Sequence, residues 1–206
     1  MTYFLLSAAV LAVALCVYFF LRRRPHALFV LAYQKVGKAP KNSRLKNEWI
    51  SPRTFEKTLV WLRAHGFTPV SLQKLTEGKL PQKPVLLAFI GGYQSFISDI
   101  FPLLEKYQMP AAVFTAPDLA GTYNAWQNPH DEPWQNLLTE KELKTLHKSG
   151  LVSLGALGLG GEDATRTPAL DATVIVRESL FRFKTQLGLK AEGFAFWPAA
   201  NFDAKQ

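Results

Sequence analysis

Residues 84–115 read PVLLAFIGGYQSFISDIFPLLEKYQMPAAVFT and contain the pattern that decides the fold. Residues 85–89 form a short apolar run that is typical of a buried strand, and the glycines at 91 and 92 predict a tight turn after it. An amphipathic helix is expected over 96–107, and a second apolar strand over 111–115. This order of strand, helix and strand indicates an α/β architecture.

The same alternation continues on both sides of this stretch. Residues 27–33 predict a buried first strand, and residues 38–50 predict a polar, basic loop. Ser51 is expected to cap a helix that Pro52 opens and Gly66 ends. Downstream, we expect a turn-rich loop over 117–136, a helix over 140–148 that Thr139 caps, a strand over 151–155, a helix over 177–187 with Leu180, Phe181 and Phe183 facing inward, and a strand over 194–197.

Three segments resemble the polysaccharide deacetylases, the NodB-type domains of carbohydrate esterase family 4. Residues 51–75, SPRTFEKTLVWLRAHGFTPVSLQKL, are close to the second segment of that family. Residues 101–114 resemble its FPLLKKYGIPATFF, and residues 32–37 resemble its Met-Tyr-His-Arg-Val-Gly opening, with Gln34 in place of the His. The resemblance implies a distorted (β/α) barrel, and the sequence leaves open whether that barrel is complete.

This chain retains the residues that flank the catalytic motifs of this family but differs from the family at the catalytic positions themselves. The family reads Thr-Phe-Asp-Asp-Gly-Tyr, where the resemblance implies a general base and a metal ligand, and this chain has Ile90 and Gly91 at those two positions. Neither residue can accept a proton or bind a cation. The resemblance also implies two His ligands in the segment that here spans 149–161, yet that segment has none. We therefore predict a pseudoenzyme with no catalytic residue, no metal and no cofactor.

Two further segments bear on the site. The run His130-Asp131-Glu132 is the one cluster that could chelate a cation, and its place in a polar loop favours a solvated surface instead. Residues 194–201, FAFWPAAN, resemble the Ala-Trp-Pro-Tyr-Gly pattern of poly-N-acetylglucosamine-type deacetylases. Trp197 and Pro198 are retained, whereas Tyr-Gly is replaced by two alanines.

Residues 2–21 form a nearly unbroken apolar run that ends at Arg22-Arg23-Arg24. About 20 helical residues span the hydrocarbon core of a bilayer. Because no charge precedes the run, it indicates an uncleaved single-pass anchor rather than a signal peptide. The expected organisation is an anchor with a basic stop over 1–24, a strand and basic juxtamembrane loop over 25–50, and a deacetylase-like domain over 28–206.

The formal net charge of +8 is concentrated beside this anchor. Residues 22–66 contain 11 Lys and Arg against two Glu, which favours contact with anionic lipid headgroups over a polyanionic glycan or nucleic acid. We predict an inner-membrane location and no nucleic-acid partner. The arginines favour a cytoplasmic domain, whereas the resemblance favours a periplasmic one. Cys16 is the only cysteine, so no intramolecular disulfide can form.

Three functions remain open from the sequence. The first is a non-catalytic, membrane-anchored protein that is a structural or accessory subunit of a membrane complex. The second is a glycan-binding module whose old cleft keeps aromatic platforms, for which the candidates are Tyr93, Trp126, Trp134 and Trp197. The third is a hydrolase acting on C–N bonds of an N-acetylated polysaccharide, which requires ligands that the motifs lack.

Overall fold

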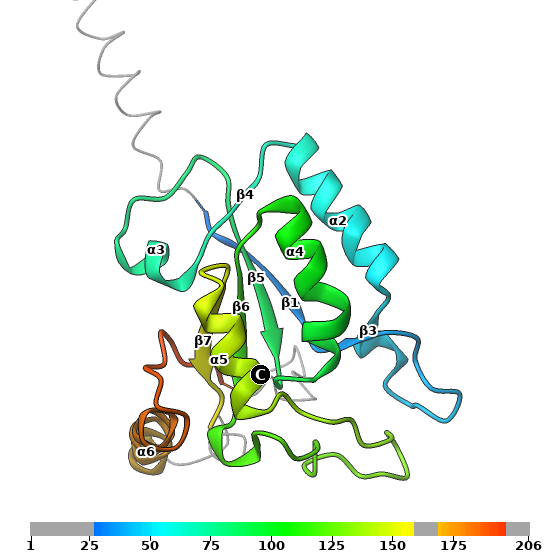
Figure 1. Cartoon of the computed structure of the whole chain (residues 1–206), viewed down its shortest axis with the longest axis vertical. Helices are drawn as coiled ribbons and strands as arrows, with labels where there is room; N and C mark the ends of the chain where they lie inside the picture. Colours follow the sequence, from blue (N-terminus) through cyan, green and yellow to red (C-terminus); the bar gives the residue numbers. More distant parts are fainter. Residues whose placement is uncertain (1–26, 159–168, 197–206) are drawn as a thin grey trace, which may run out of the picture.

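The computed structural model describes residues 27–158 and 169–196. Its centre is a five-stranded sheet in the order β1-β5-β6-β7, with β4 paired to β5 (Figure 1). All of these pairings are parallel, which confirms the predicted α/β class. The elements are β1 (Phe29–Tyr33), β2 (Lys35–Val36), η1 (Lys46–Glu48), β3 (Trp49–Ile50), α2 (Pro52–Ala64), β4 (Thr68–Pro69), α3 (Leu72–Thr76), β5 (Pro84–Ile90), η2 (Phe96–Ile100), α4 (Phe101–Tyr107), β6 (Ala111–Thr115), η3 (Pro117–Leu119), α5 (Glu140–Lys148), β7 (Val152–Ala156) and α6 (Ala169–Leu187).

Local sequence signals account for the helix starts. The Ser51 hydroxyl accepts a hydrogen bond from the backbone N–H of Thr54, and Pro52 occupies the first turn of α2. At α5, Thr139 and Glu142 form a reciprocal capping box, which satisfies two backbone donors at once. The expected helix over 96–107 divides into a π-helical η2 and the α-helix α4, with a proline in the first turn of α4.

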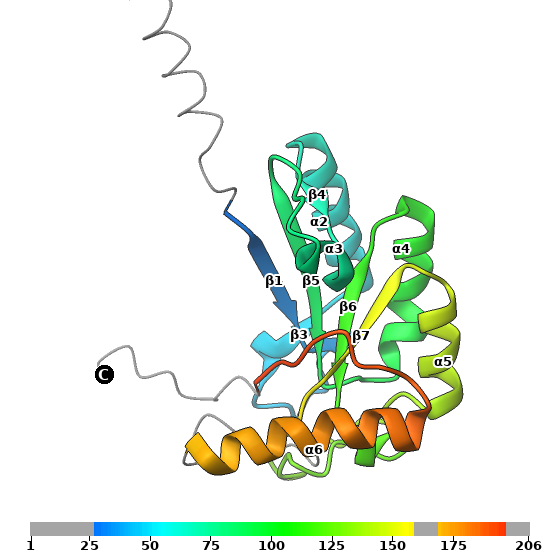
Figure 2. The same ribbon diagram turned by 90° about the vertical axis from the view of Figure 1, so that its left-hand side faces the viewer.

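The core lies mainly between the sheet and helices α2, α4 and α5, which cover one face (Figures 1 and 2). The opposite face carries a smaller apolar cluster, to which Leu72 of α3 contributes. Helix α6 runs across the carboxyl end of the sheet (Figure 2). It is held there by a hydrogen bond from the Ser179 hydroxyl to the carbonyl of Gly158 (2.8 Å) and by an ion pair between Arg182 and Asp118 (2.5 Å).

Two expectations about burial were wrong. Strand β1 was expected to be buried, but Phe29 and Val30 are 51% and 53% exposed. Among the described residues β1 pairs only with β5, so it forms the edge of the sheet and lacks a neighbour on its outer side. In α6, Phe183 is buried as expected, whereas Leu180 and Phe181 are exposed. The buried face of α6 follows four-residue steps through Ser179, Phe183 and Leu187, and these steps leave positions 180 and 181 outside.

Two other expectations fall at the margins of the described structure. Of the strand expected over 194–197, the described residues 194–196 contain a single bridge, between Ala156 and Phe194. No helix in the described ranges is long and apolar enough to cross a bilayer. The anchor predicted over 1–24 lies outside those ranges, as does Trp197.

Candidate functional site

The altered motif lies at the carboxyl end of β5, beside the ends of β6 and β7. In parallel sheets this edge is the usual place for a binding or catalytic site. Ile90 is buried here and packs in the smaller cluster with Phe114 and Leu157. The backbone N–H of Gly91 donates to the carbonyl of Phe114 (2.9 Å), so the turn is fixed to the neighbouring strand. The strand ends therefore present an apolar surface where the family resemblance implies carboxylates.

The turn after β5 excludes side chains at both glycines. Gly91 and Gly92 have φ angles of 107° and 70°, which residues with a Cβ adopt only under strain. A Cβ added to Gly91 would lie 2.6 Å from Cε2 of Tyr93. A Cβ added to Gly92 would lie 2.4 Å from Oγ1 of Thr115. The turn in this conformation has no room for an aspartate at either position.

The residues at this edge do not fit the metal that the fold family implies. A catalytic zinc needs three protein ligands drawn from His, Cys and carboxylates. The strand ends offer Ile90 and Gly91 from β5, Thr115 from β6 and the apolar residues 156–158 at the end of β7. Across the described ranges, no group of three or more His, Cys, Asp or Glu side chains is arranged to hold a metal ion. No chemical step through a metal can be derived from these residues.

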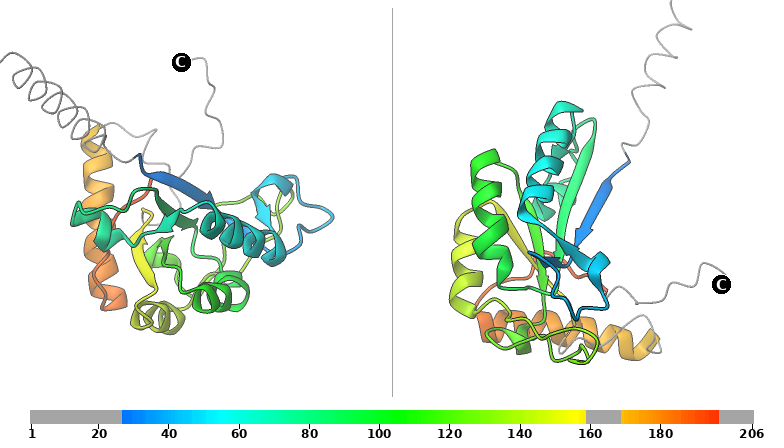
Figure 3. Two further views of the ribbon diagram at one scale, coloured as in Figure 1. Left: turned by 90° about the horizontal axis from the view of Figure 1, so that it is seen from above. Right: turned by 90° about the vertical axis from the view of Figure 1, so that its right-hand side faces the viewer.

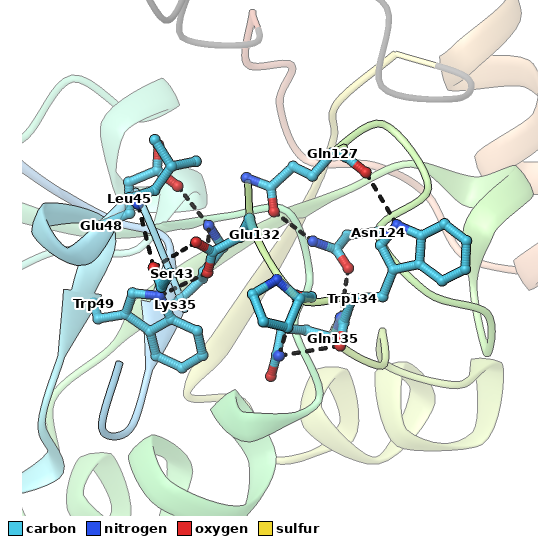
Figure 4. A network of polar contacts seen from close by, with 11 residues as sticks. Lys35, Ser43, Leu45, Glu48, Trp49, Asn124, Gln127, Glu132, Trp134 and Gln135 are labelled. Carbon is cyan, nitrogen blue, oxygen red and sulfur yellow. Dashed lines mark hydrogen bonds and ion pairs between the residues drawn. The ribbon is translucent and has the colours of Figure 1, made fainter. Parts of the chain in front are cut away.

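A network of polar contacts surrounds the buried side chains of Lys35 and Glu132 (Figure 4). Lys35 is 1% exposed, and its ammonium Nζ lies 2.6 Å from Glu48 Oε2 and 3.5 Å from Glu132 Oε1. The Glu132 carboxylate also accepts hydrogen bonds from the Ser43 hydroxyl (2.5 Å) and from the Trp49 indole Nε1 (2.8 Å). The network thus joins the segment between β1 and α2 to the loop between β6 and α5.

The interpretation of residues 130–132 as a solvated cluster is wrong for Glu132. Its side chain is fully buried, while His130 is exposed and Asp131 forms an exposed ion pair with Arg44. Burial alone would raise the pKa of Glu132, but the hydrogen bonds from Ser43 and Trp49, together with the charge of Lys35, outweigh it and hold that pKa below its ordinary value. Glu132 is therefore a structural carboxylate.

Tyr93 connects the apolar edge to the charged network. Its side chain is 3% exposed, and the Lys35 ammonium lies 6.0 Å from the centre of its ring. Burial raises the pKa of its hydroxyl well above the ordinary value. The Trp126 ring packs edge-on against it, with 6.2 Å between the ring centroids. The structure therefore places these two predicted platforms in contact, with Tyr93 buried and Trp126 half-buried.

Trp134 lies apart from that pair. It is 47% exposed and stacks on Tyr123, with ring centroids 4.4 Å apart and an interplanar angle of 25°. Its indole Nε1 donates to the carbonyl of Gln127 (3.0 Å), and the buried side chain of Asn124 also bonds within this loop (Figure 4). Tyr123 was not among the predicted platforms, since its only sequence signal is an aromatic residue in the same turn-rich loop.

Comparison with known proteins shows similarity to deacetylases, although no family model matches the chain. The poly-beta-1,6-N-acetyl-D-glucosamine N-deacetylase of Escherichia coli (strain K12) is 36% identical over 93 residues, which cover 42% of this chain and 14% of that protein. The protein of the same name from Staphylococcus aureus (strain MSSA476) is 26% identical over 145 residues, or 64% of this chain and 48% of that protein. The chain therefore spans less than half the length of either relative.

Among solved structures, the Streptococcus pyogenes deacetylase PplD in complex with acetate superposes with a TM-score of 0.66 at 20% identity. This superposition covers 87% of this chain and 77% of PplD. At this level of identity, the structural likeness establishes the fold.

Proposed function

Since the chain carries a domain of the NodB polysaccharide deacetylase type, we propose that this domain is non-catalytic and acts as a membrane-anchored structural or accessory subunit of a membrane complex. One observation carries the proposal: the strand ends that hold the chemistry in this family are closed by Ile90, Gly91 and Leu157. Apolar side chains pack there without the desolvation cost that unpaired carboxylates would incur.

The surroundings of this edge support the same role. Helix α6 lies across the carboxyl end of the sheet, and the charged network binds the two flanking loops to each other. Such a domain keeps a fixed shape without a reacting group, which suits a binding surface better than a catalyst. We place it at the inner membrane, where the arginines at 22–24 favour the cytoplasmic side.

The test is the composition of the native protein after gentle extraction of the full chain from its own membrane. We expect a defined partner at fixed stoichiometry and less than one equivalent of zinc by elemental analysis. A monomer without partner would overturn the accessory role. One equivalent of bound zinc, with release of acetate from poly-β-1,6-N-acetylglucosamine, would instead establish a hydrolase.

The exposed pair of Tyr123 and Trp134 favours glycan binding as a second candidate. Stacked aromatic faces that are open to solvent can receive the apolar face of a sugar ring. If this candidate is right, Trp134→Ala should weaken binding of poly-β-1,6-N-acetylglucosamine oligosaccharides by about tenfold, which is roughly 1.4 kcal/mol. Titration calorimetry on the full chain would measure this. The control is Trp61→Ala, because Trp61 is similarly exposed at 51% but lies on α2. Absence of saturable binding to the unmodified chain would exclude this candidate.

A further inference from the structure

A second surface, far from the altered motif, gathers exposed aromatic side chains where β1 begins. The Phe29 and Phe67 rings meet edge-to-face with centroids 5.5 Å apart, and Trp61 stacks on Phe67 at 5.7 Å. Phe29 and Trp61 are each 51% exposed, and they line an apolar groove of about 600 Å³ between β1 and α2. We call the surface formed by Phe29, Trp61 and Phe67 the aromatic face.

Basic side chains surround the aromatic face. Lys57 lines the groove from α2, and Lys83 lies with its ammonium 5.6 Å from the centre of the Phe67 ring. Arg63 and Glu56 lie on the side of α2 that faces α4, where the Arg63 guanidinium donates to the carbonyl of Tyr107 (2.6 Å) and Glu56 pairs with Lys106 (2.7 Å). Neither of them lines the groove, so its charged lining comes from lysine. The rim of the aromatic face is therefore cationic.

The sequence limits how far the aromatic face can lie from the predicted anchor. Phe29 follows Arg24 by five residues, and a chain of that length reaches at most about 18 Å even when fully extended. The headgroup layer on each side of a bilayer is roughly 5–8 Å thick. If residues 2–21 span the membrane, Phe29 stays within about 18 Å of Arg24, and a linker that is not fully extended lets it contact the headgroups.

We propose that the aromatic face docks on the headgroup region of an anionic bilayer. Trp61 and Phe29 enter the interface, where amphipathic aromatic rings are favoured. Lys57 and Lys83 contact lipid phosphates, because an anionic membrane surface attracts basic side chains that lie close to it. This inference rests on the membrane anchoring in the proposed function, and adds a second, folded contact that sets the orientation of the domain.

Docking on this side leaves the other end of the sheet free. The end of α2 and β4 lie at one end of the molecule, and the loop between β6 and α5 lies at the opposite end (Figure 1). Figure 3 shows the same separation, with α6 at the far end from the tip of α2. The apolar edge at Ile90 and the Tyr123–Trp134 pair then face away from the bilayer, where a partner or a glycan can reach them.

The experiment uses the full chain in vesicles of phosphatidylcholine and phosphatidylglycerol, with and without phosphatidylcholine brominated near the top of the acyl chain. Bromine quenches tryptophan emission only at short range. We expect quenching that Trp61→Phe largely removes and that Trp134→Phe leaves unchanged, since Trp134 is equally exposed at the far end. Removal of phosphatidylglycerol, or the double substitution Lys57→Glu and Lys83→Glu, should reduce the component due to Trp61.

Flotation of the same samples separates this inference from the anchor. A chain that floats with the vesicles while Trp61 stays unquenched overturns the docking face and leaves the anchor standing. A chain that does not float overturns both. Loss of quenching as the protein-to-lipid ratio rises would show that a second copy, and not lipid, covers the aromatic face, and would likewise overturn the proposal.

Discussion

Two buried clusters lie on either side of Tyr93, and they differ in charge: the cluster around Ile90 is apolar, whereas the network of Lys35 and Glu132 is charged. On one side, Ile90 and its neighbours are apolar, although carboxylates stand at the equivalent motif positions of the family. On the other side, Lys35 and Glu132 form an ion pair with side chains that are 1% and 0% exposed. The two clusters differ in the partners that they offer to a charged side chain. Each charge of the network has a protein partner within 3.5 Å, whereas the part of the chain that the structure describes supplies no metal-binding group to a carboxylate at position 90 or 91.

Removal of the central cation, Lys35, should have the largest effect on the free energy of unfolding. Lys35→Met leaves Glu132 buried without its cation, and we expect a loss of about 3–5 kcal/mol in the free energy of unfolding. Denaturant titration followed by circular dichroism measures this loss. Lys38→Met is the matched control, because Lys38 is exposed, and it should change stability by less than about 0.5 kcal/mol. Equal effects for the two variants would show that the network contributes nothing.

Return of a carboxylate to the apolar cluster should have the next largest effect. Gly91→Asp combines a strained φ with a clash against Tyr93, and we expect a loss of about 2–3 kcal/mol without any gain of zinc binding. Gly66→Asp is the control for φ alone, since Gly66 has a φ of 72° and no atom within 4 Å of an added Cβ. That variant should lose only about 1 kcal/mol. If the two losses match in denaturant titrations, the packing of Tyr93 against Gly91 is irrelevant.

The smallest effect is a change in pH dependence. The fold lowers the pKa of Glu132, so its carboxylate stabilises the protein above the unfolded-state value of 4.5, and this contribution is lost as pH falls from there through the folded-state pKa. The difference in unfolding free energy between wild type and Glu132→Gln should therefore be largest near neutral pH and shrink below pH 4.5. Glu77→Gln, at an exposed position, should show no such trend. A constant difference down to pH 3 would contradict the role assigned to Glu132.

Features set by neighbouring residues were predictable from the sequence. The caps at Ser51 and Thr139 and the strand over 111–115 depend on contacts within a few positions, and the structure contains each of them. The α/β class followed from the same local alternation. The positions of the altered motif could also be identified, because the scaffold segments that flank Ile90 keep their pattern.

Features set by distant residues were not predictable in the same way. Glu132 reads as a loop carboxylate, and its burial depends on Ser43, 89 positions away. Strand β1 reads as a core strand because its composition is apolar, yet its exposure depends on which strands stand beside it. The stacking of Trp134 on Tyr123 depends on the fold of the whole loop, which periodicity does not describe.

The turn at Gly91 and Gly92 also bears on the history of the domain. Since Gly91 adopts a positive φ and a Cβ added to it would clash with Tyr93, an aspartate can enter this position only if the backbone or Tyr93 moves. A variant with aspartate alone would be less stable than its parent, so selection for stability would act against it. In a lineage that carries this turn, position 91 is therefore expected to remain glycine unless Tyr93 changes with it.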